Sequence, residues 1–211
     1  MNMKIKQIKN FFDEEDYKLI CSLPLKKKIN DNSIAVYHNR ISKDDHVVSE
    51  LINDETLRNF QKKYHPIALK ILEELFPEKV KLYDYSEFHL VETGKNFNFP
   101  IHDDIPNKLL SGVIYIKPEK NSGTIFYKTK SGKGKNEMKW EVNKAIFFSR
   151  SERETWHSYS GDGISNRVTI VYNLMTNDIK KVFAIEGKNN IYGKFRSFIN
   201  PYLFRFFKRT I

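Results

Sequence analysis

Residues 109–149 read LLSGVIYIKPEKNSGTIFYKTKSGKGKNEMKWEVNKAIFFS. Short runs rich in Ile, Val, Tyr and Phe alternate there with polar segments. Apolar runs of this length, bounded by turn residues, are typical of β-strands. Asn-Ser-Gly at residues 121–123 and Ser-Gly-Lys-Gly at residues 131–134 fit hairpin connections. The stretch therefore predicts consecutive antiparallel strands.

The strand pattern continues on both sides of this stretch and covers residues 80–176. We predict strands at residues 81–91, 109–116, 124–128, 138–141, 145–149 and 167–174. Several short antiparallel strands that follow a helical N-terminal part favour a mainly β fold with helices (α+β). The expected core is a jelly-roll barrel, and the helices pack against it.

The first 79 residues are predicted to supply this helical support after one short strand near residues 4–8. Asp13 is expected to cap a helix that ends near Leu23. A second helix is expected after Asp54, with Pro66 breaking or kinking it. Its apolar residues recur at intervals of three and four, as on the buried face of a helix: they are Leu57, Phe60, Tyr64, Ile67, Ala68, Ile71, Leu72 and Leu75.

Composition restricts the class of protein. The 211 residues suffice for one domain with a substantial core, and 40% of them are hydrophobic. No apolar run approaches the roughly 20 residues needed to span a bilayer. The N-terminus lacks the apolar segment of a signal peptide. Cys21 is the single cysteine, so no internal disulfide can form, and a cytoplasmic location is expected.

The net charge is +10, from 36 Lys and Arg against 26 Asp and Glu. Such an excess invites a nucleic-acid interpretation. Much of it is surface lysine in a chain rich in Lys, Ile and Asn, so charge alone does not assign a partner. The C-terminal part, residues 177–211, mixes aromatic and basic residues. It is predicted to fold back as a helical cover, and the alternative is a surface for a partner or a membrane.

The sequence Ile101-His102-Asp103-Asp104 carries the first candidate metal ligands. Residues two apart on an extended chain point to the same side, so His102 and Asp104 are expected to face one interior. His157 lies 55 residues later and can supply a second imidazole. Two imidazoles and one carboxylate leave open coordination positions, as in the facial triad of non-haem iron(II) oxygenases. His-x-Asp alone is a weak signal.

Arg167 strengthens the assignment. It is expected to open a strand ten residues after His157, and Thr169 shares its face. A buried arginine is costly unless an anion pairs with it, and its forked guanidinium suits a carboxylate. Arg167 and Thr169 are therefore candidate ligands of a carboxylate.

The order His102-x-Asp104, His157, Arg167 resembles the 2-oxoglutarate/iron(II)-dependent oxygenase superfamily, and in particular its prolyl-hydroxylase-like branch. The segments at residues 111–116, 122–127 and 144–149 are similar to strands of that family, and Gly94 matches a family turn. The likeness covers about residues 82–174. The helix entry at Phe11-Phe12-Asp13 also fits.

The resemblance implies a double-stranded β-helix (jelly-roll, cupin-like) core at residues 80–176 of a single oxygenase domain, 1–211. It implies iron(II) on His102, Asp104 and His157. The cosubstrate 2-oxoglutarate would bind Arg167, Thr169 and Tyr115, and dioxygen would be the second cosubstrate. The expected reaction is hydroxylation of a C–H bond with decarboxylation of 2-oxoglutarate to succinate and carbon dioxide. Members of the superfamily that halogenate their substrates lack the metal-binding carboxylate. Asp104 supplies this carboxylate here, so hydroxylation is the expected reaction.

Two departures from relatives narrow the substrate. Glu92 stands where relatives often carry a tyrosine, which argues against a peptidyl-proline substrate. Asn173 stands where nucleic-acid demethylases of the superfamily usually carry a second arginine, which argues against nucleic acid. A small molecule, a saccharide and a protein side chain all remain candidate substrates.

The alternatives come from other classes. A non-oxidative cupin-like isomerase or sugar-binding module needs His102 and His157 but not Arg167. A binding protein that acts through its basic C-terminal segment needs no catalytic site. Among the other polar residues, Asp103 is expected to face solvent, His89 to be packed or solvated, and Asp44-Asp45-His46 to be a surface segment.

Overall fold

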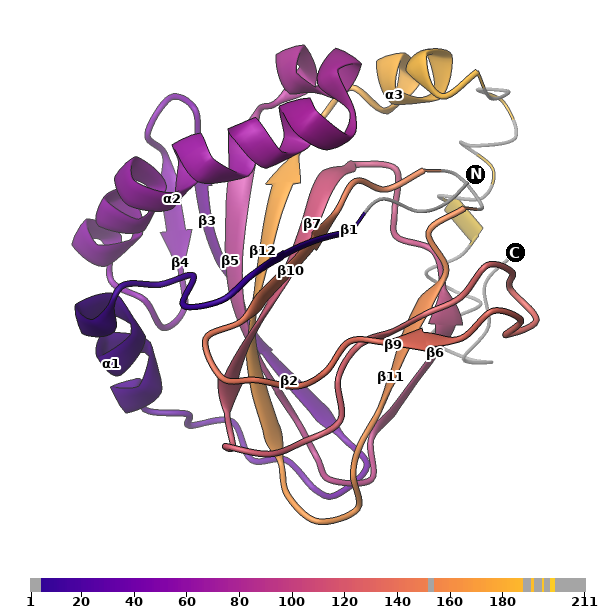
Figure 1. Ribbon diagram of the computed structural model, residues 1–211. Helices are drawn as coiled ribbons and strands as arrows, with labels where there is room; N and C mark the ends of the chain where they lie inside the picture. The colour runs from indigo at the N-terminus through magenta and orange to yellow at the C-terminus, as the bar shows by residue number, and fades with distance from the viewer. Residues whose placement is uncertain (1–4, 152–153, 188–190, 192–194, 196–197, 200–211) are drawn as a thin grey trace.

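The computed structural model describes residues 5–151, 154–187, 191, 195, 198 and 199 (Figure 1). Its helices are α1 (Glu14–Ser22), α2 (Asp54–Leu75), the 3-10 helix η1 (Pro77–Leu82) and α3 (Ile179–Ile185). Its strands are β1 (Ile5–Ile8), β2 (Ile34–Tyr37), β3 (Asn39–Ser42), β4 (Val47–Ser49), β5 (Tyr85–Thr93), β6 (Asn98–His102), β7 (Lys108–Lys117), β8 (Ile125–Phe126), β9 (Asn136–Glu137), β10 (Ala145–Phe148), β11 (His157–Ser160) and β12 (Arg167–Met175).

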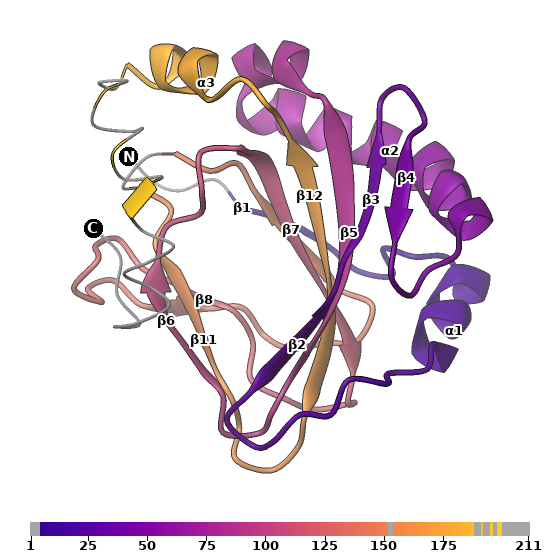
Figure 2. The ribbon, with the colours of Figure 1, turned by 180° about the vertical axis from the view of Figure 1, so that it is seen from behind.

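The strands form two antiparallel sheets. The larger sheet has the order β1-β10-β7-β12-β5-β3-β4, with β2 also paired to β5, and the smaller has the order β6-β11-β8-β9. Figures 1 and 2 show the two sheets facing each other, with α1 and α2 on the outer side of the larger sheet. The prediction of a mixed fold of mostly antiparallel strands is confirmed.

Strands β5 and β12 lie side by side in the larger sheet. One face of these strands packs on the hydrophobic core, and the other faces the space between the two sheets. Ile170 pairs with Leu90 and Tyr172 pairs with Phe88, and these side chains are fully buried in the core. The intervening residues on both strands face the space between the sheets. The two-residue alternation of a strand thus gives each one a structural face and a face available for function.

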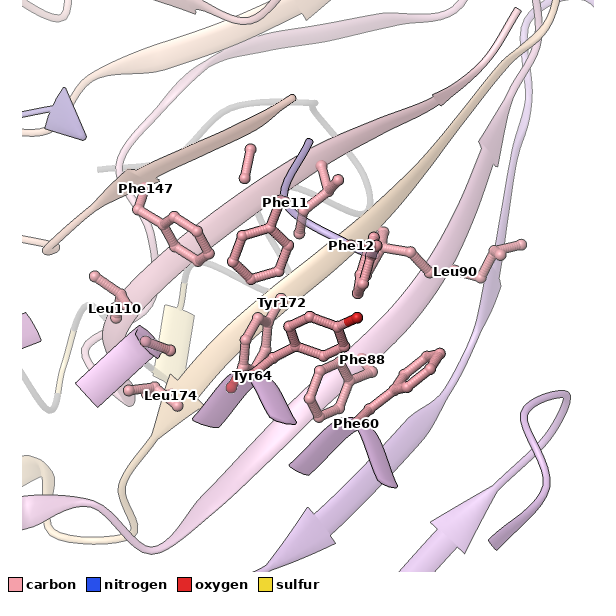
Figure 3. Close-up of a cluster of buried hydrophobic side chains, with 14 of the residues drawn as sticks. Phe11, Phe12, Phe60, Tyr64, Phe88, Leu90, Leu110, Phe147, Tyr172 and Leu174 are labelled. Carbon is pink, nitrogen blue, oxygen red and sulfur yellow. The ribbon is translucent and has the colours of Figure 1, made fainter. Parts of the chain in front are cut away.

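Aromatic rings fill the core between α2 and the larger sheet (Figure 3). Phe88 stacks on Tyr172 with ring centroids 4.2 Å apart, and the Phe12 and Tyr64 rings meet edge to face at 4.9 Å. Such pairs each add about 0.5–1.5 kcal/mol beyond the burial of their area. This packing fixes the larger sheet as a rigid platform. The α2 residues buried here are Leu57, Phe60, Tyr64, Ala68, Ile71 and Leu72.

Both predicted N-terminal helices are present. Asp13 caps α1, because its carboxylate accepts a hydrogen bond from the Asp16 amide at 2.9 Å. The expected break at Pro66 is wrong, since α2 runs through this residue. Pro66 lies on the exposed face, where water can bind the carbonyl that the missing N–H would have used. Ile67, placed on the apolar face by its spacing, is 41% exposed.

The strand predictions are confirmed for β1, β7, β10 and β12, while the others need correction. Residues 81 and 82 belong to η1, so β5 begins only at Tyr85. Residues 138–141 form no strand, and β9 lies just before them. Trp140 in that segment is buried because its ring stacks on Tyr115. The predicted strand at residues 124–128 is only the two residues of β8, and strands β2, β3, β4, β6 and β11 were not predicted.

Among the described residues, no helix has both the length and the apolar character to cross a membrane. Helix α3 opens the predicted C-terminal helical segment. Most of the basic and aromatic residues of the 177–211 segment lie outside the described residues.

Candidate metal centre

Three predicted ligands meet between the two sheets. His102 ends β6 and His157 begins β11, and the antiparallel pairing of these strands sets the two residues opposite each other. Asp104 lies just beyond the end of β6. One ligand atom from each residue lies within 4.8 Å of the others. The spacing suits a single metal ion.

The backbone fixes how both imidazoles face the centre. The Nδ1 atom of His102 lies 3.0 Å from the Pro100 carbonyl oxygen, and that of His157 lies 2.9 Å from the Thr155 carbonyl oxygen. A carbonyl only accepts, so Nδ1 must donate and Nε2 keeps its lone pair for a metal. Burial and the nearby His157 lower the pKa of His102 from 6.5 to about 3. The His102 ring is therefore neutral and ready to coordinate.

Asp104 supplies the negative charge of the centre. Its carboxylate accepts hydrogen bonds from Lys108 Nζ at 2.7 Å and from Ser111 Oγ at 2.6 Å. Burial alone would raise the pKa of this carboxyl, but the charge and hydrogen bond of Lys108, together with the nearby imidazoles, lower it. Asp104 is thus ionised at neutral pH, as metal binding requires.

Asp103 was expected to face solvent, and this expectation is wrong. Its side chain is buried, and it accepts a hydrogen bond from the Thr155 hydroxyl at 2.7 Å. The Thr155 carbonyl oxygen is the one that orients His157. The hydrogen bond between Asp103 and Thr155 therefore connects the loop that contains Asp104 with the start of β11, where His157 lies.

A buried ion network supports the same loop. The Arg150 Nε atom donates to the Asp104 carbonyl oxygen at 3.2 Å, and its Nη1 atom donates to Glu186 at 2.7 Å. Lys79 lies 2.7 Å from the other Glu186 oxygen. These three side chains are all at most 1% exposed. Glu186 directly follows α3, so the end of that helix is tied to the metal-binding loop.

We expect Thr155→Val, which removes only the hydroxyl group, to weaken metal binding about tenfold or more, the usual scale for groups that orient metal ligands. Cobalt(II) titration followed by visible absorption measures the affinity. The matched control is Thr129→Val in an exposed turn. An unchanged cobalt affinity in Thr155→Val would contradict the positioning role of Thr155.

Arg167 faces the same interior from the start of β12. It is 5% exposed, and its guanidinium carbon lies 3.7 Å from the centroid of the Tyr159 ring. Burial lowers the pKa of this guanidinium. Within residues 5–151 and 154–187, no carboxylate pairs with it and its Nε atom has no hydrogen-bond partner. A buried cation without an anion points to an anionic ligand.

The other two predicted cosubstrate residues differ in their placement. Thr169 lines the interior beside Arg167. Tyr115 does not line it, and its hydroxyl oxygen accepts a hydrogen bond from the Thr124 amide at 2.8 Å. Tyr159 lines the cavity and its ring lies nearer to Arg167, at 3.7 Å from the guanidinium carbon, against 5.5 Å for the Tyr115 ring. The signal available in the sequence was its position two residues after His157 on the same strand.

The centre opens into one cavity of about 420 Å³, large enough for a small organic ligand. Glu92 does not line this cavity. Its neighbours Val91 and Thr93 on β5 do, and successive side chains of a strand point to opposite faces. His89, expected to be packed or solvated, does line it. Asp44 and His46 lie in an exposed segment, as predicted. The cavity wall includes Val91, Phe97, Phe99, His102, Asp104, Lys108, Ser111, Val113, His157, Tyr159, Arg167, Thr169, Val171 and Asn173.

No family model matches the chain, and no curated protein matches it significantly in sequence. Solved structures do match. A prolyl-4-hydroxylase from Pseudomonas putida aligns with a TM-score of 0.55 and 11% identity, over 83% of this chain and 94% of that one. An oxidoreductase of the 2OG-Fe(II) oxygenase family from Burkholderia pseudomallei aligns with a TM-score of 0.55 and 15% identity, over 81% and 84%.

A third match is a prolyl hydroxylase from Trichoplax adhaerens, solved with a peptide fragment of the hypoxia inducible factor oxygen degradation domain. Its TM-score is 0.54 at 12% identity, over 84% of this chain and 86% of that one. The chain therefore has the fold of the 2OG-Fe(II) oxygenases. Within that class it is similar to prolyl hydroxylases, which confirms the resemblance at the level of the fold.

Proposed function

We propose that the protein is an iron(II)- and 2-oxoglutarate-dependent dioxygenase that hydroxylates a C–H bond of its substrate. The observation that carries this proposal is the combination of two features in one cavity. Two imidazoles and a carboxylate converge there, and within the described part of the chain no carboxylate pairs with the buried Arg167. The donor set fits iron(II), since imidazole and carboxylate leave open positions for further ligands.

Each residue has a defined role in this proposal. His102, Asp104 and His157 hold the iron. Arg167 binds the distal carboxylate of 2-oxoglutarate through its forked donors, with Thr169 as an additional hydroxyl donor and Tyr159 packing on the guanidinium. Iron bound at this centre would activate dioxygen while 2-oxoglutarate is decarboxylated to succinate and carbon dioxide. The apolar cavity wall excludes water from the reacting groups.

We further infer that the two facing sheets form a double-stranded β-helix and that residues 1–211 make up a single domain. Interleaved strand orders support this topology, since β7, β10 and β12 of the larger sheet alternate along the chain with β6, β8 and β11 of the smaller one. A cytoplasmic location and a substrate other than nucleic acid belong to the same proposal.

The competing functions predict different ligands. A non-oxidative isomerase or sugar-binding module with this triad has no use for a buried arginine that lacks an anion. A binding protein without catalysis needs neither the metal-binding triad nor a buried Arg167. Arg167 therefore favours the oxygenase, because leaving a guanidinium unpaired in the interior costs several kcal/mol in the absence of its ligand.

The test is an anaerobic titration of the protein with iron(II) and 2-oxoglutarate. We expect a weak visible absorption band that develops only when metal, cosubstrate and protein are all present, because a chelated 2-oxo acid on iron(II) gives such a band. On admission of air, slow succinate release should follow even without a primary substrate. Iron binding with neither band nor succinate would refute the proposal.

A further inference from the structure

Polar groups gather at one end of the cavity. Asn173 on β12 pairs in register with Glu87 on β5, and His89 follows on the same face of β5. Arg167 lies six residues from Asn173 along β12, which is about 20 Å on an extended strand. The cavity thus has a cationic end at Arg167 and a second polar end at Glu87 and Asn173. Apolar residues, among them Val91 and Val171, line the sheet between them.

The orientation of the Asn173 amide follows from its partner. Its Nδ2 atom donates to Glu87 Oε2 at 2.9 Å. A carboxylate only accepts, so the amide nitrogen must face Glu87, and Oδ1 is directed elsewhere. In the described part of the chain that Oδ1 atom is buried and has no donor. Asn173 therefore keeps one unused acceptor.

His89 adds no spare donor. Its Nδ1 atom accepts a hydrogen bond from the Asn39 backbone N–H at 3.3 Å, so the ring proton is on Nε2. Nε2 lies 3.5 Å from Glu87 Oε1, longer than a good hydrogen bond. Glu87 and Asn173 therefore offer acceptors to the cavity, whereas His89 offers none, because its Nδ1 atom is engaged by Asn39 and its ring proton faces Glu87.

Glu87 is a charged member of this cluster. Burial would raise its pKa, but the nearby ring N–H of His89, the hydrogen bond from Asn173 and the charge of Lys108 lower it, so it is an anion at neutral pH. The cation Lys108 lines the same cavity, but its ammonium group is bound to Asp104. Arg40 on β3 pairs in register with Glu87, and its guanidinium lies over the Tyr85 ring. An anion facing an apolar cavity prefers a cationic, proton-donating ligand.

We propose that Glu87 and Asn173 bind a protonated amine of the primary substrate, whose apolar part packs against Val91, Val113 and Val171. This proposal rests on the proposed oxygenase function, since it places the amine beside the metal centre. Asn173 pairs in register with Ser111, and Ser111 donates to the Asp104 carboxylate. Carbons next to the bound amine would therefore lie close to the metal-binding residues.

The experiment compares three probes of equal length: hexylammonium, 1-hexanol and hexanoate. Calorimetric titration of the protein with zinc(II) and 2-oxoglutarate present measures binding without turnover. We expect hexylammonium to bind at least about tenfold more tightly than 1-hexanol, because charge-assisted hydrogen bonds are the stronger kind. Glu87→Gln should abolish this preference and leave 1-hexanol binding unchanged.

Glu92→Gln is the matched control, because Glu92 lies on the same strand and does not line the cavity. It should keep the wild-type preference. Equal binding of the three probes to the wild type would mean that Lys108 or another internal group already satisfies Glu87, and would overturn the proposal. A preference for hexanoate would overturn it as well. These outcomes are measured on the wild type, so they do not depend on whether the variant folds.

Failure of this proposal is distinguishable from failure of the oxygenase function. If hexylammonium shows no preference while cobalt(II) and 2-oxoglutarate still bind, only the amine site is wrong. If 2-oxoglutarate does not bind to the wild type, the function itself is wrong. Glu87→Gln should bind 2-oxoglutarate with wild-type affinity, since Arg167 lies at the opposite end of the cavity.

Discussion

Asp104→Ala is expected to weaken iron(II) binding by at least about 100-fold and to abolish succinate release. Substitutions of groups that merely orient ligands cost 10–100-fold in metal affinity, so loss of the carboxylate ligand itself should exceed that range. Two imidazoles would remain, without a negative charge to balance the metal. Cobalt(II) titration and a succinate assay measure the two effects.

Folding should survive this substitution. Asp104 follows the end of β6, and its main partner Lys108 is still 20% exposed, so its ammonium group can turn to water. Asp44→Ala, in an exposed segment, is the control and should behave as the wild type. Wild-type cobalt affinity in a folded Asp104→Ala variant would remove this carboxylate from the metal centre.

The candidate ligands could be predicted from sequence because each has a local signal. His102 and Asp104 are two residues apart, and Arg167 opens a run of β-branched residues that was recognised as a strand. The distance between His157 and His102 is set by the pairing of β6 with β11, which no local pattern encodes. The resemblance to a known family supplied that long-range contact.

The groups that support the ligands have no comparable signal. Asp103 looks like a solvent-facing neighbour of two ligands, yet the Thr155 hydroxyl binds it in the interior. Arg150 and Glu186 are 36 residues apart and form a buried ion pair that reaches the Asp104 carbonyl. Charged residues are usually exposed, so composition predicts the opposite of what these side chains do.

The alternation of side chains along β5 and β12 explains both the stability and the function of the larger sheet. Phe88 and Tyr172 face the core, while Glu87 and Asn173 face the cavity from adjacent positions. A one-residue shift of register would exchange the two sets. The aromatic core that holds this register therefore also holds Arg167 inside the cavity.

Arg167→Met is expected to weaken 2-oxoglutarate binding by at least about 100-fold and to leave metal affinity nearly unchanged. A hydrogen bond to a charged group contributes about 1.5–3 kcal/mol, and a forked pair makes two of them. Methionine keeps an apolar body against the Tyr159 ring without any donor. Calorimetry with zinc(II)-loaded protein measures the cosubstrate, and cobalt(II) titration measures the metal. Arg40→Met, on the surface, is the control.

The same substitution should stabilise the ligand-free protein. Burying an unpaired guanidinium costs several kcal/mol, whereas a desolvated contact with an aromatic ring such as that of Tyr159 returns about 2 kcal/mol. The unfolding midpoint should therefore rise, by about 2–4 °C for each kcal/mol gained. Saturating 2-oxoglutarate should reverse the order, because it binds the wild type far more tightly than the variant and therefore stabilises it more. A variant that is less stable without ligand and binds 2-oxoglutarate normally would show that Arg167 serves the fold alone.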